Sequence, residues 1–264
     1  LAALASENGL LRQLLLYRFD KGRGLAGHNL GNLILTALED MVGSEPEAVT
    51  QAAKILRLKG KVIPISNQLV TLAAQYSSGK TVISEHKIEI HKLALNEKII
   101  NLYTIPQAFI NPQAALEIKR ADLIILAPGD LYNSIIANLV IKGAKTGLKT
   151  SKARLVYIVN LMTLNSQTHG FTAKDHLKEI EAYSGRPVDY IIVNNQPIST
   201  KILKAYEKYL EYPVKDDLGH DPRVIRQPLL AADTYKKPQS DKLKRSLLRH
   251  DSIKLAQAII NIIG

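Results

Sequence analysis

One segment, residues 121–138, constrains the fold more than any other part of the sequence. It reads ADLIILAPGDLYNSIIAN, in which an apolar run at Leu123–Ala127 stops at Pro128-Gly129-Asp130. Apolar residues then recur at three- and four-residue spacing from Leu131 to Leu139, which is the period of a helix. A buried strand, a tight glycine turn and a helix start form the usual ligand cradle of an open parallel sheet. Free backbone N–H groups at such a place favour an anion.

Two further strand–helix units follow this one. The pattern predicts strands over 123–127, 154–160 and 190–194, and helices over about 133–148, 173–183, 200–210 and 253–263. Successive units of this kind give parallel strands with helices on both faces of the sheet. We therefore predict an α/β fold with a three-layer, doubly wound, mostly parallel sheet.

The first part of the chain has a different pattern. Residues 1–57 have helical periodicity, with segments at 10–18, 29–42 and 45–56, whereas about 60–105 holds short alternating runs. Such runs, separated by turn residues, are typical of an antiparallel ribbon. We predict this β-rich insertion as an extension of one domain over residues 1–264. A doubly wound domain normally opens with a strand and a glycine-rich turn, so we expect an N-terminally truncated form, in which that unit is either missing or never existed.

Charge and the absence of cysteine narrow the classes of function. The formal net charge is +11, and there is no cysteine, which excludes disulfides, thiolate metal sites and thiol nucleophiles and fits a cytoplasmic protein. No apolar run is long enough to cross a bilayer. Basic residues gather at Lys236, Lys237, Lys242, Lys244, Arg245, Arg249 and Lys254. These basic residues are explained by solvent-exposed helix faces and loops. The alternatives are a surface that binds nucleic acid or one that attracts a phosphorylated ligand. The sequence contains no nucleic-acid-binding motif that would support the nucleic-acid surface.

Polar side chains follow the predicted strands. Asn160 and Thr163 come after one strand, and Asn194-Asn195 after the next. Because the carboxyl ends of parallel strands meet at one edge of a sheet, these residues predict a crevice for a polar ligand. Asp130 has two interpretations, the cap of the helix that follows or a ligand of a divalent cation that bridges phosphates.

A second polar group lies near the N-terminus, at the predicted start of a helix. Gly27-His28-Asn29 and Asn32 are interpreted either as a turn and helix cap or as contacts to a phosphate or sugar. His176 is interpreted as a structural histidine. The sequence has no G-x-S-x-G, no H-E-x-x-H and no Walker motif, so nothing in it supports a serine hydrolase, a zinc protease or a P-loop kinase.

Together these residues carry a family resemblance that covers nearly the whole chain. In order, the blocks are GHNLGN at 27–32, Asn67-Gln68, PGDLYNSI at 128–135, NLMTLNSQTHGF at 160–171 and RHD at 249–251. The chain resembles the family that joins the gluconeogenesis factors (YvcK-like) to the 2-phospho-L-lactate transferases (CofD-like), and it is more similar to the first branch. The family's glycine-rich N-terminal turn and its Asp-Asp-Gly-Gly segment are absent, and Asp130 stands where a serine is usual.

The resemblance implies a Rossmann-like fold that binds UDP-N-acetylglucosamine or another phosphate-bearing small molecule. It implies a regulator of carbon metabolism, cell-wall synthesis and cell shape, without a firm cofactor. The alternative is a magnesium-dependent 2-phospho-L-lactate transferase of deazaflavin coenzyme biosynthesis, in which Asp130 would contact Mg²⁺. Homo-oligomerisation is a further expectation, whereas a membrane or nucleic-acid partner is not expected.

The candidate ligand-binding residues combine the strand-end positions with those that the resemblance implies, Tyr206 and Arg249 among the latter. They are Gly27, His28, Asn29, Asn32, Asn67, Pro128, Gly129, Asp130, Tyr132, Ser134, Asn160, Thr163, Asn194, Asn195, Tyr206 and Arg249.

Overall fold

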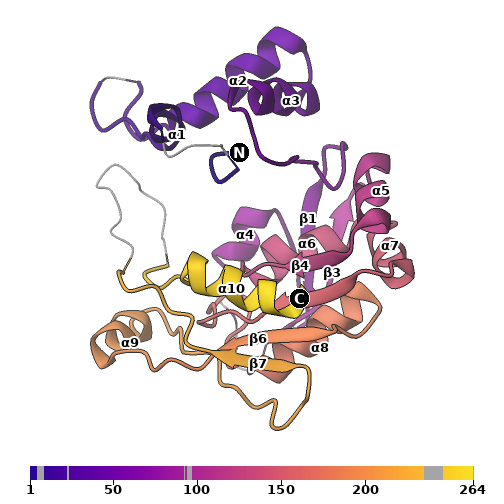
Figure 1. Cartoon of the computed structure of the whole chain (residues 1–264), viewed down its shortest axis with the longest axis vertical. Helices are drawn as coiled ribbons and strands as arrows, with labels where there is room; N and C mark the ends of the chain where they lie inside the picture. The colour runs from indigo at the N-terminus through magenta and orange to yellow at the C-terminus, as the bar shows by residue number, and fades with distance from the viewer. Residues whose placement is uncertain (5–8, 23, 92, 94–96, 235–245, 264) are drawn as a thin grey trace. The chain divides into compact units, whose positions relative to one another are not determined.

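A computed structural model describes residues 1–4, 9–22, 24–91, 93, 97–234 and 246–263 (Figure 1). Contacts between Cα atoms divide the chain into two compact units. One holds Leu1–Pro64, and the other holds Ile65–Thr234 and Leu247–Gly264. The organisation of residues 1–264 as a single domain stays a prediction.

The N-terminal unit consists of the three helices that the periodicity predicts. They are α1 (Leu10–Leu16), α2 (Leu30–Val42) and α3 (Glu45–Ile55). The Asn29 side chain accepts a hydrogen bond from the Asn32 backbone N–H at 3.0 Å and so caps α2. Gly43, in the left-handed conformation at φ 78°, ends α2, and Pro46 opens the next helix.

The second unit is built on a parallel sheet in the order β4-β5-β6-β7. Its strands are β4 (Leu123–Leu126), β5 (Arg154–Ile158), β6 (Tyr190–Asn194) and β7 (Val224–Gln227). All three pairings are parallel, which confirms the predicted α/β class. The pattern of the sequence does not predict β7, because this strand has only four residues, and two of them are the exposed Arg226 and the partly exposed Gln227.

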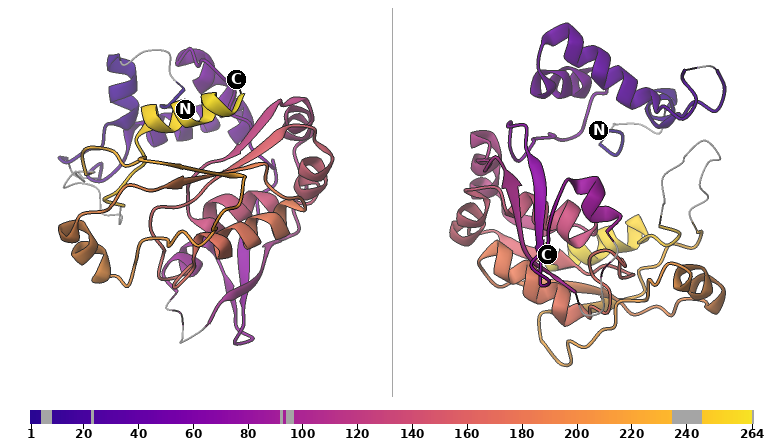
Figure 2. Two further views of the ribbon diagram at one scale, coloured as in Figure 1. Left: turned by 60° about the horizontal axis from the view of Figure 1, so that its bottom comes forward. Right: turned by 180° about the vertical axis from the view of Figure 1, so that it is seen from behind.

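Helices cover both faces of this sheet, as Figure 2 shows for α10 (Ser252–Ile263, yellow) and α8 (Ala173–Ser184). On one face Leu155 and Ile191 pack in a cluster with Leu177 and Ile180 of α8. On the other, Val156 and Ile192 pack with Ala258 and Ile262 of α10. Neighbouring strand residues point to opposite faces, so consecutive residues in the middle of β5 and β6 are apolar. The three layers of the doubly wound prediction are therefore present.

The helix predicted over 133–148 is broken into three pieces. A π-helix, η1 (Leu131–Ile136), continues as α6 (Ala137–Leu139), and α7 (Ala144–Thr150) begins after a turn. Gly143 ends the turn at φ 102°, a conformation that a helix interior does not contain. The prediction of one continuous helix is wrong because apolar periodicity does not reveal this turn.

The β-rich extension forms an antiparallel sheet in the order β2-β1-β3. Its strands are β1 (Thr71–Tyr76), β2 (Thr81–Ile83) and β3 (Ile99–Ile105), and two short helices, α4 (Glu85–Glu89) and α5 (Pro112–Arg120), accompany it. Not all of the alternating sequence is strand, because β2 ends at Ile83 and the chain then turns into α4. Another helix of the unit, α9 (Thr200–Glu207), starts as predicted and ends three residues earlier than the prediction.

We predict that Gly143→Ala destabilises the fold by about 2–4 kcal/mol in urea unfolding. A Cβ at this position would lie 2.6 Å from Cγ2 of Ile110, so overpacking adds to the strain of a positive φ. Gly79→Ala is the matched control, since Gly79 also has a positive φ but nothing within 4 Å of its Cβ position. We expect that control to lose only about 1 kcal/mol. Equal losses would contradict the role of the Ile110 contact.

Candidate functional site

The turn after β4 is tied to the end of β5 by an amide. Asn160 Nδ2 donates to the Gly129 carbonyl oxygen at 2.7 Å. The Asp130 carbonyl oxygen accepts from the N–H groups of Ser134 at 2.9 Å and Ile135 at 3.2 Å, which starts the π-helix. The Asp130 side chain does not cap this helix. A Cβ on Gly129 would lie 3.1 Å from Ser134 Cβ, so a larger residue would crowd Ser134 in this turn.

The loop after β5 is fixed by two buried polar side chains. Thr163 Oγ1 accepts from the Tyr212 N–H at 2.9 Å, while the Thr163 N–H donates to the Tyr212 carbonyl at 2.7 Å. Gln167, which is 1% exposed, accepts through Oε1 from the Tyr132 N–H at 3.1 Å. Gln167 is not among the predicted site residues; its only signal in the sequence is its place in the polar loop 165–170. Thr163 therefore anchors the loop, and Gln167 joins it to η1.

The two asparagines after β6 have different surroundings. Asn194 Oδ1 accepts from the N–H groups of Leu229 at 2.9 Å and Gln196 at 3.3 Å, and its Nδ2 donates to the Gln196 carbonyl. Asn195 is exposed, and its backbone N–H donates to the Gln227 carbonyl at 3.0 Å. Asn194 thus joins the ends of β6 and β7, whereas the Asn195 side chain extends from the same edge.

The segment 248–251 runs antiparallel to the chain after β7. Ala231 donates to the Arg249 carbonyl at 3.0 Å, Asp251 donates to the Leu229 carbonyl at 2.7 Å, and Leu230 pairs with His250. Side chains alternate along an extended segment. Consistent with this, Arg249 is exposed, whereas Leu248 is buried and His250 is partly buried.

Tyr206 and Asp251 hold this segment at its two ends. The buried Tyr206 hydroxyl accepts from the Leu248 N–H at 3.0 Å. Asp251 Oδ1 accepts from the N–H groups of Ile253 and Lys254, and so caps α10. Tyr206, predicted as a ligand contact, positions the segment that carries Arg249.

Buried polar atoms without a partner gather on the segments that follow these strands. Among the described residues, the atoms with no hydrogen-bond partner include Asn133 Oδ1, Asn160 Oδ1, Ser166 Oγ, Gln167 Nε2, Gln196 Oε1 and His250 Nε2. Others lie in the core, on Tyr76, Tyr132, Tyr157 and His176. Because buried polar atoms are normally hydrogen-bonded, the cluster at the strand ends marks a place that can receive the polar groups of a ligand.

Two histidines of the unit are held in the neutral form by burial. Desolvation lowers the pKa of His250 below its usual value, and it lowers the pKa of His176 in the same direction. His176 is fully buried, with Nδ1 2.9 Å from the Thr172 carbonyl. Thr172 and Asp175 form a capping box at the start of α8, so His176 belongs to the packing of that helix.

The remaining candidates belong to the N-terminal unit or to other positions of the second unit. Gly27, His28, Asn29 and Asn32 belong to the N-terminal unit, in which Asn29 is the cap of α2. Asn67 Oδ1 accepts from Asn111 Nδ2 at 3.2 Å and holds segment 65–68 beside α5. Tyr132 is fully buried beside Leu131 in η1. Pro128 and Ser134 flank the Gly129 turn; Pro128 is half-buried and Ser134 exposed.

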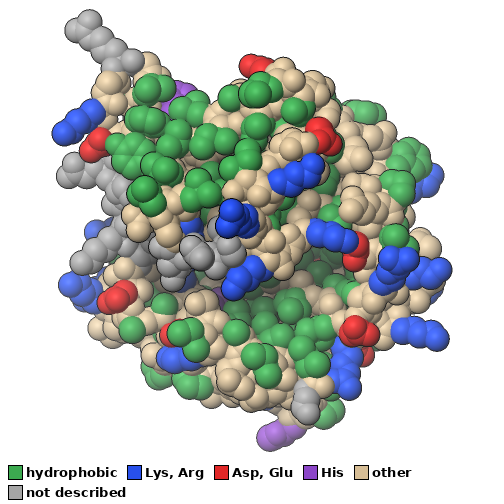
Figure 3. Space-filling view, turned by 45° about the horizontal axis from the view of Figure 1, so that its top comes forward, with side chains coloured by type: hydrophobic (Ala, Val, Ile, Leu, Met, Phe, Trp, Pro, Cys, Tyr) green, Lys and Arg blue, Asp and Glu red, His purple; other side chains and the backbone are tan. Residues whose placement is uncertain are grey.

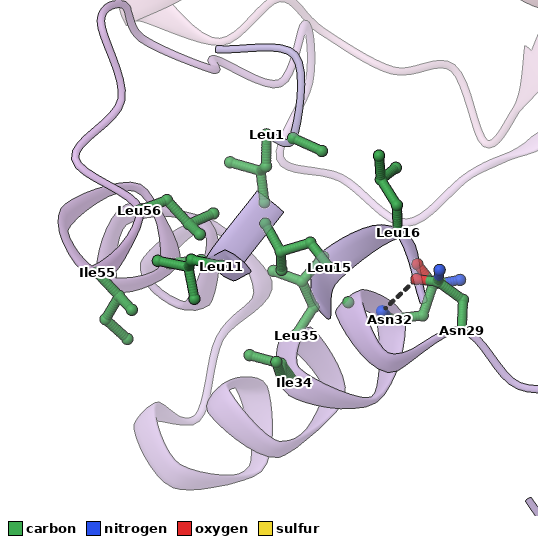
Figure 4. A pocket seen from close by; sticks show the side chains of 13 residues that line it. Leu1, Leu11, Leu15, Leu16, Asn29, Asn32, Ile34, Leu35, Ile55 and Leu56 are labelled. Atoms are coloured by element: carbon green, nitrogen blue, oxygen red, sulfur yellow. Dashed lines mark hydrogen bonds between the residues drawn. The ribbon is translucent and has the colours of Figure 1, made fainter. Parts of the chain in front are cut away.

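The N-terminal unit has a hollow of its own, an apolar pocket of about 310 Å³ (Figure 4). Leu11, Leu15, Leu35 and Leu56 are among the residues that line it. Asn29 and Asn32 also line the pocket, but the bond drawn there joins the two residues. Figure 3 shows hydrophobic side chains on the surface of the protein. In this unit Leu16 and Ile55 are more than half exposed.

Several predictions concern charge, metals and membranes. In the part of the chain that the structure describes, no group of three or more His, Asp or Glu residues is arranged to hold a metal ion. The contact of Asp130 with Mg²⁺ stays a prediction. Lys236, Lys237, Lys242, Lys244 and Arg245 lie outside the described residues. None of the described helices is long and apolar enough to span a membrane.

We predict that Asn194→Ala lowers the free energy of unfolding by about 2 kcal/mol, because it leaves the Leu229 N–H without its acceptor. Asn195→Ala, the adjacent exposed asparagine, is the matched control and should change stability by less than about 0.5 kcal/mol. Urea unfolding of the two variants measures the difference. Equal stability of the variants would contradict the role of Asn194 as the tie between β6 and β7.

Comparison with known proteins shows the family of this chain. The family model described as 2-phospho-L-lactate transferase CofD matches residues 1–232. The gluconeogenesis factor of Bacillus subtilis is 34% identical over 269 residues, which cover 100% of this chain and 80% of that protein. The gluconeogenesis factor of Halalkalibacterium halodurans is 35% identical over 262 residues, which cover 98% and 78%.

A solved structure agrees with these relatives. The crystal structure of a UPF0052 family member from Bacillus halodurans superposes with a TM-score of 0.83 at 33% identity, covering 98% of this chain and 80% of that one. The chain therefore belongs to the CofD family, and relatives that match almost its whole length carry the name gluconeogenesis factor.

Proposed function

We propose that this protein is a gluconeogenesis factor that binds UDP-N-acetylglucosamine at the carboxyl edge of the parallel sheet. In this role it regulates carbon metabolism, cell-wall synthesis and cell shape. The observation that carries the binding proposal is the group of buried polar atoms without partners that follow β4, β5 and β6. The family resemblance supplies the identity of the ligand and the regulatory role.

The energetics of these atoms favour a polar ligand. A buried polar atom without a partner costs about 1–3 kcal/mol, and Asn160, Gln196 and His250 each carry one. A nucleotide sugar offers many hydroxyl and amide groups that can bond such atoms. Ligands of open parallel sheets bind at the carboxyl ends of the strands, which is where these residues lie.

Two features beside these atoms suit the phosphates. Arg249 is exposed on the segment that pairs with the chain after β7, and a guanidinium can bind a phosphate through two parallel hydrogen bonds. The net charge of +11 attracts anions over a longer range. Asp130 opposes an anion at the Gly129 turn, so we assign the phosphates to the Arg249 side of the edge.

We predict that UDP-N-acetylglucosamine gives measurable heat in titration calorimetry, and that Arg249→Ala weakens its affinity by about 10- to 100-fold. This range corresponds to the loss of a charge-assisted hydrogen bond of about 1.5–3 kcal/mol. Arg120→Ala is the matched control, because Arg120 is exposed and precedes β4, at the opposite edge of the sheet. We expect its affinity to match that of the wild type.

Two results would contradict this proposal. One is a wild-type protein that gives neither heat nor a thermal shift with UDP-N-acetylglucosamine. The other is equal binding by the wild type, Arg249→Ala and Asn195→Ala, which would favour a protein-interaction scaffold that has the fold without the ligand.

A second candidate function follows from the description of the matching family model, 2-phospho-L-lactate transferase. It is transfer of phospholactate from an activated nucleotide to a deazaflavin in the presence of magnesium. A coupled assay for the phospholactyl deazaflavin tests it. Product would support the transferase, and its absence with magnesium present, together with binding of UDP-N-acetylglucosamine, would favour the regulator.

A further inference from the structure

His250 lies across the carboxyl edge of the sheet, between the ends of two strands. Its backbone pairs with Leu230, which follows β7. Its ring interacts with the backbone carbonyl of Val159, the first residue after β5. Since β6 lies between β5 and β7 in the sheet, these two contacts place the ring over the end of β6.

One nitrogen of the ring is placed to accept a hydrogen bond from a ligand. Nε2 is buried and has no hydrogen-bond partner among the described residues. With the ring proton on Nδ1, Nε2 is the nitrogen that can accept. Burial lowers the pKa of the ring, so the neutral form dominates at neutral pH. Nε2 then presents a lone pair and acts as a hydrogen-bond acceptor.

Two more acceptors follow the same strands. Asn160, next to Val159, donates through Nδ2 to Gly129, which fixes its amide so that Oδ1 is the atom without a partner. Gln196 comes two residues after the end of β6, and its Oε1 has no partner among the described residues. The backbone of Gln196 is held in place by both its N–H and its carbonyl, which bond the Asn194 side chain.

We propose that His250 Nε2, Asn160 Oδ1 and Gln196 Oε1 form an acceptor subsite that binds a sugar hydroxyl of the ligand. This inference rests on the proposed binding of a nucleotide sugar and specifies which part of it lies at the end of β6. All three atoms accept hydrogen bonds. The oxygens of an ionised phosphate can also only accept, so a phosphate cannot form hydrogen bonds with these three atoms. A hydroxyl donates, and both sugars of UDP-N-acetylglucosamine carry hydroxyls.

Titration calorimetry of the full chain with UDP-N-acetylglucosamine and with UDP tests this subsite. His250→Phe keeps a ring of similar shape without the Nε2 acceptor, and Gln196→Met keeps the chain length without Oε1. We expect each substitution to weaken the affinity for UDP-N-acetylglucosamine by about tenfold. His250→Gln carries an acceptor near the position of Nε2 and should stay within about threefold of the wild type. His220→Phe, an exposed histidine before the amino end of β7, is the matched control and should bind like the wild type.

The UDP titration identifies the sugar. A loss confined to UDP-N-acetylglucosamine assigns the hydroxyl to the hexose, whereas an equal loss for UDP assigns it to the ribose, and both support the subsite. If wild type, His250→Phe and Gln196→Met bind UDP-N-acetylglucosamine equally, the subsite is overturned while the proposed function stands. The subsite is also overturned if His250→Gln binds UDP-N-acetylglucosamine as weakly as His250→Phe does. In that case a change in packing, and not the missing acceptor, would explain the loss of affinity. A wild type that binds neither nucleotide overturns the proposed function and this inference with it.

Discussion

The parallel pairing of β4 to β7 is the constraint on which the rest of the second unit depends. Parallel strands need crossover connections, and the helices of those connections cover both faces of the sheet. Leu155 and Val156 illustrate the result, since each is fully buried on an opposite face. No face is left for a polar ligand, so polar chemistry is confined to the ends of the strands.

Asparagine suits these ends because its amide both donates and accepts. Asn160 uses its donor to hold the turn after β4 and leaves its acceptor unpaired. Asn194 uses both halves of its amide to hold the segments after β6 and β7. The same residue type therefore serves two purposes. An asparagine whose amide oxygen and nitrogen both bond the chain stabilises the sheet edge, whereas one with an unpaired amide oxygen can also contact a ligand.

Much of the fold could be predicted from the sequence where the signal is local. Apolar periodicity predicts α2 and α8, which the structure contains. β7 and the break at Gly143 could not be found in this way. β7 depends on pairing with β6 rather than on its own four residues, and the turn at Gly143 depends on how the chain packs at Ile110. The strand-end asparagines were predicted, whereas Gln167 and His250 were not, because their burial results from contacts between distant segments.

The RHD segment shows why such contacts matter for function. Nothing in three consecutive polar residues indicates which of them faces inward. Pairing with the chain after β7 sets the alternation, so that Arg249 is exposed, His250 turns inward and Asp251 caps α10. The guanidinium of Arg249 and the imidazole of His250 then lie on opposite sides of this segment. That arrangement separates the groups suited to a phosphate from the group suited to a sugar, and a slip of one residue in the pairing would exchange them.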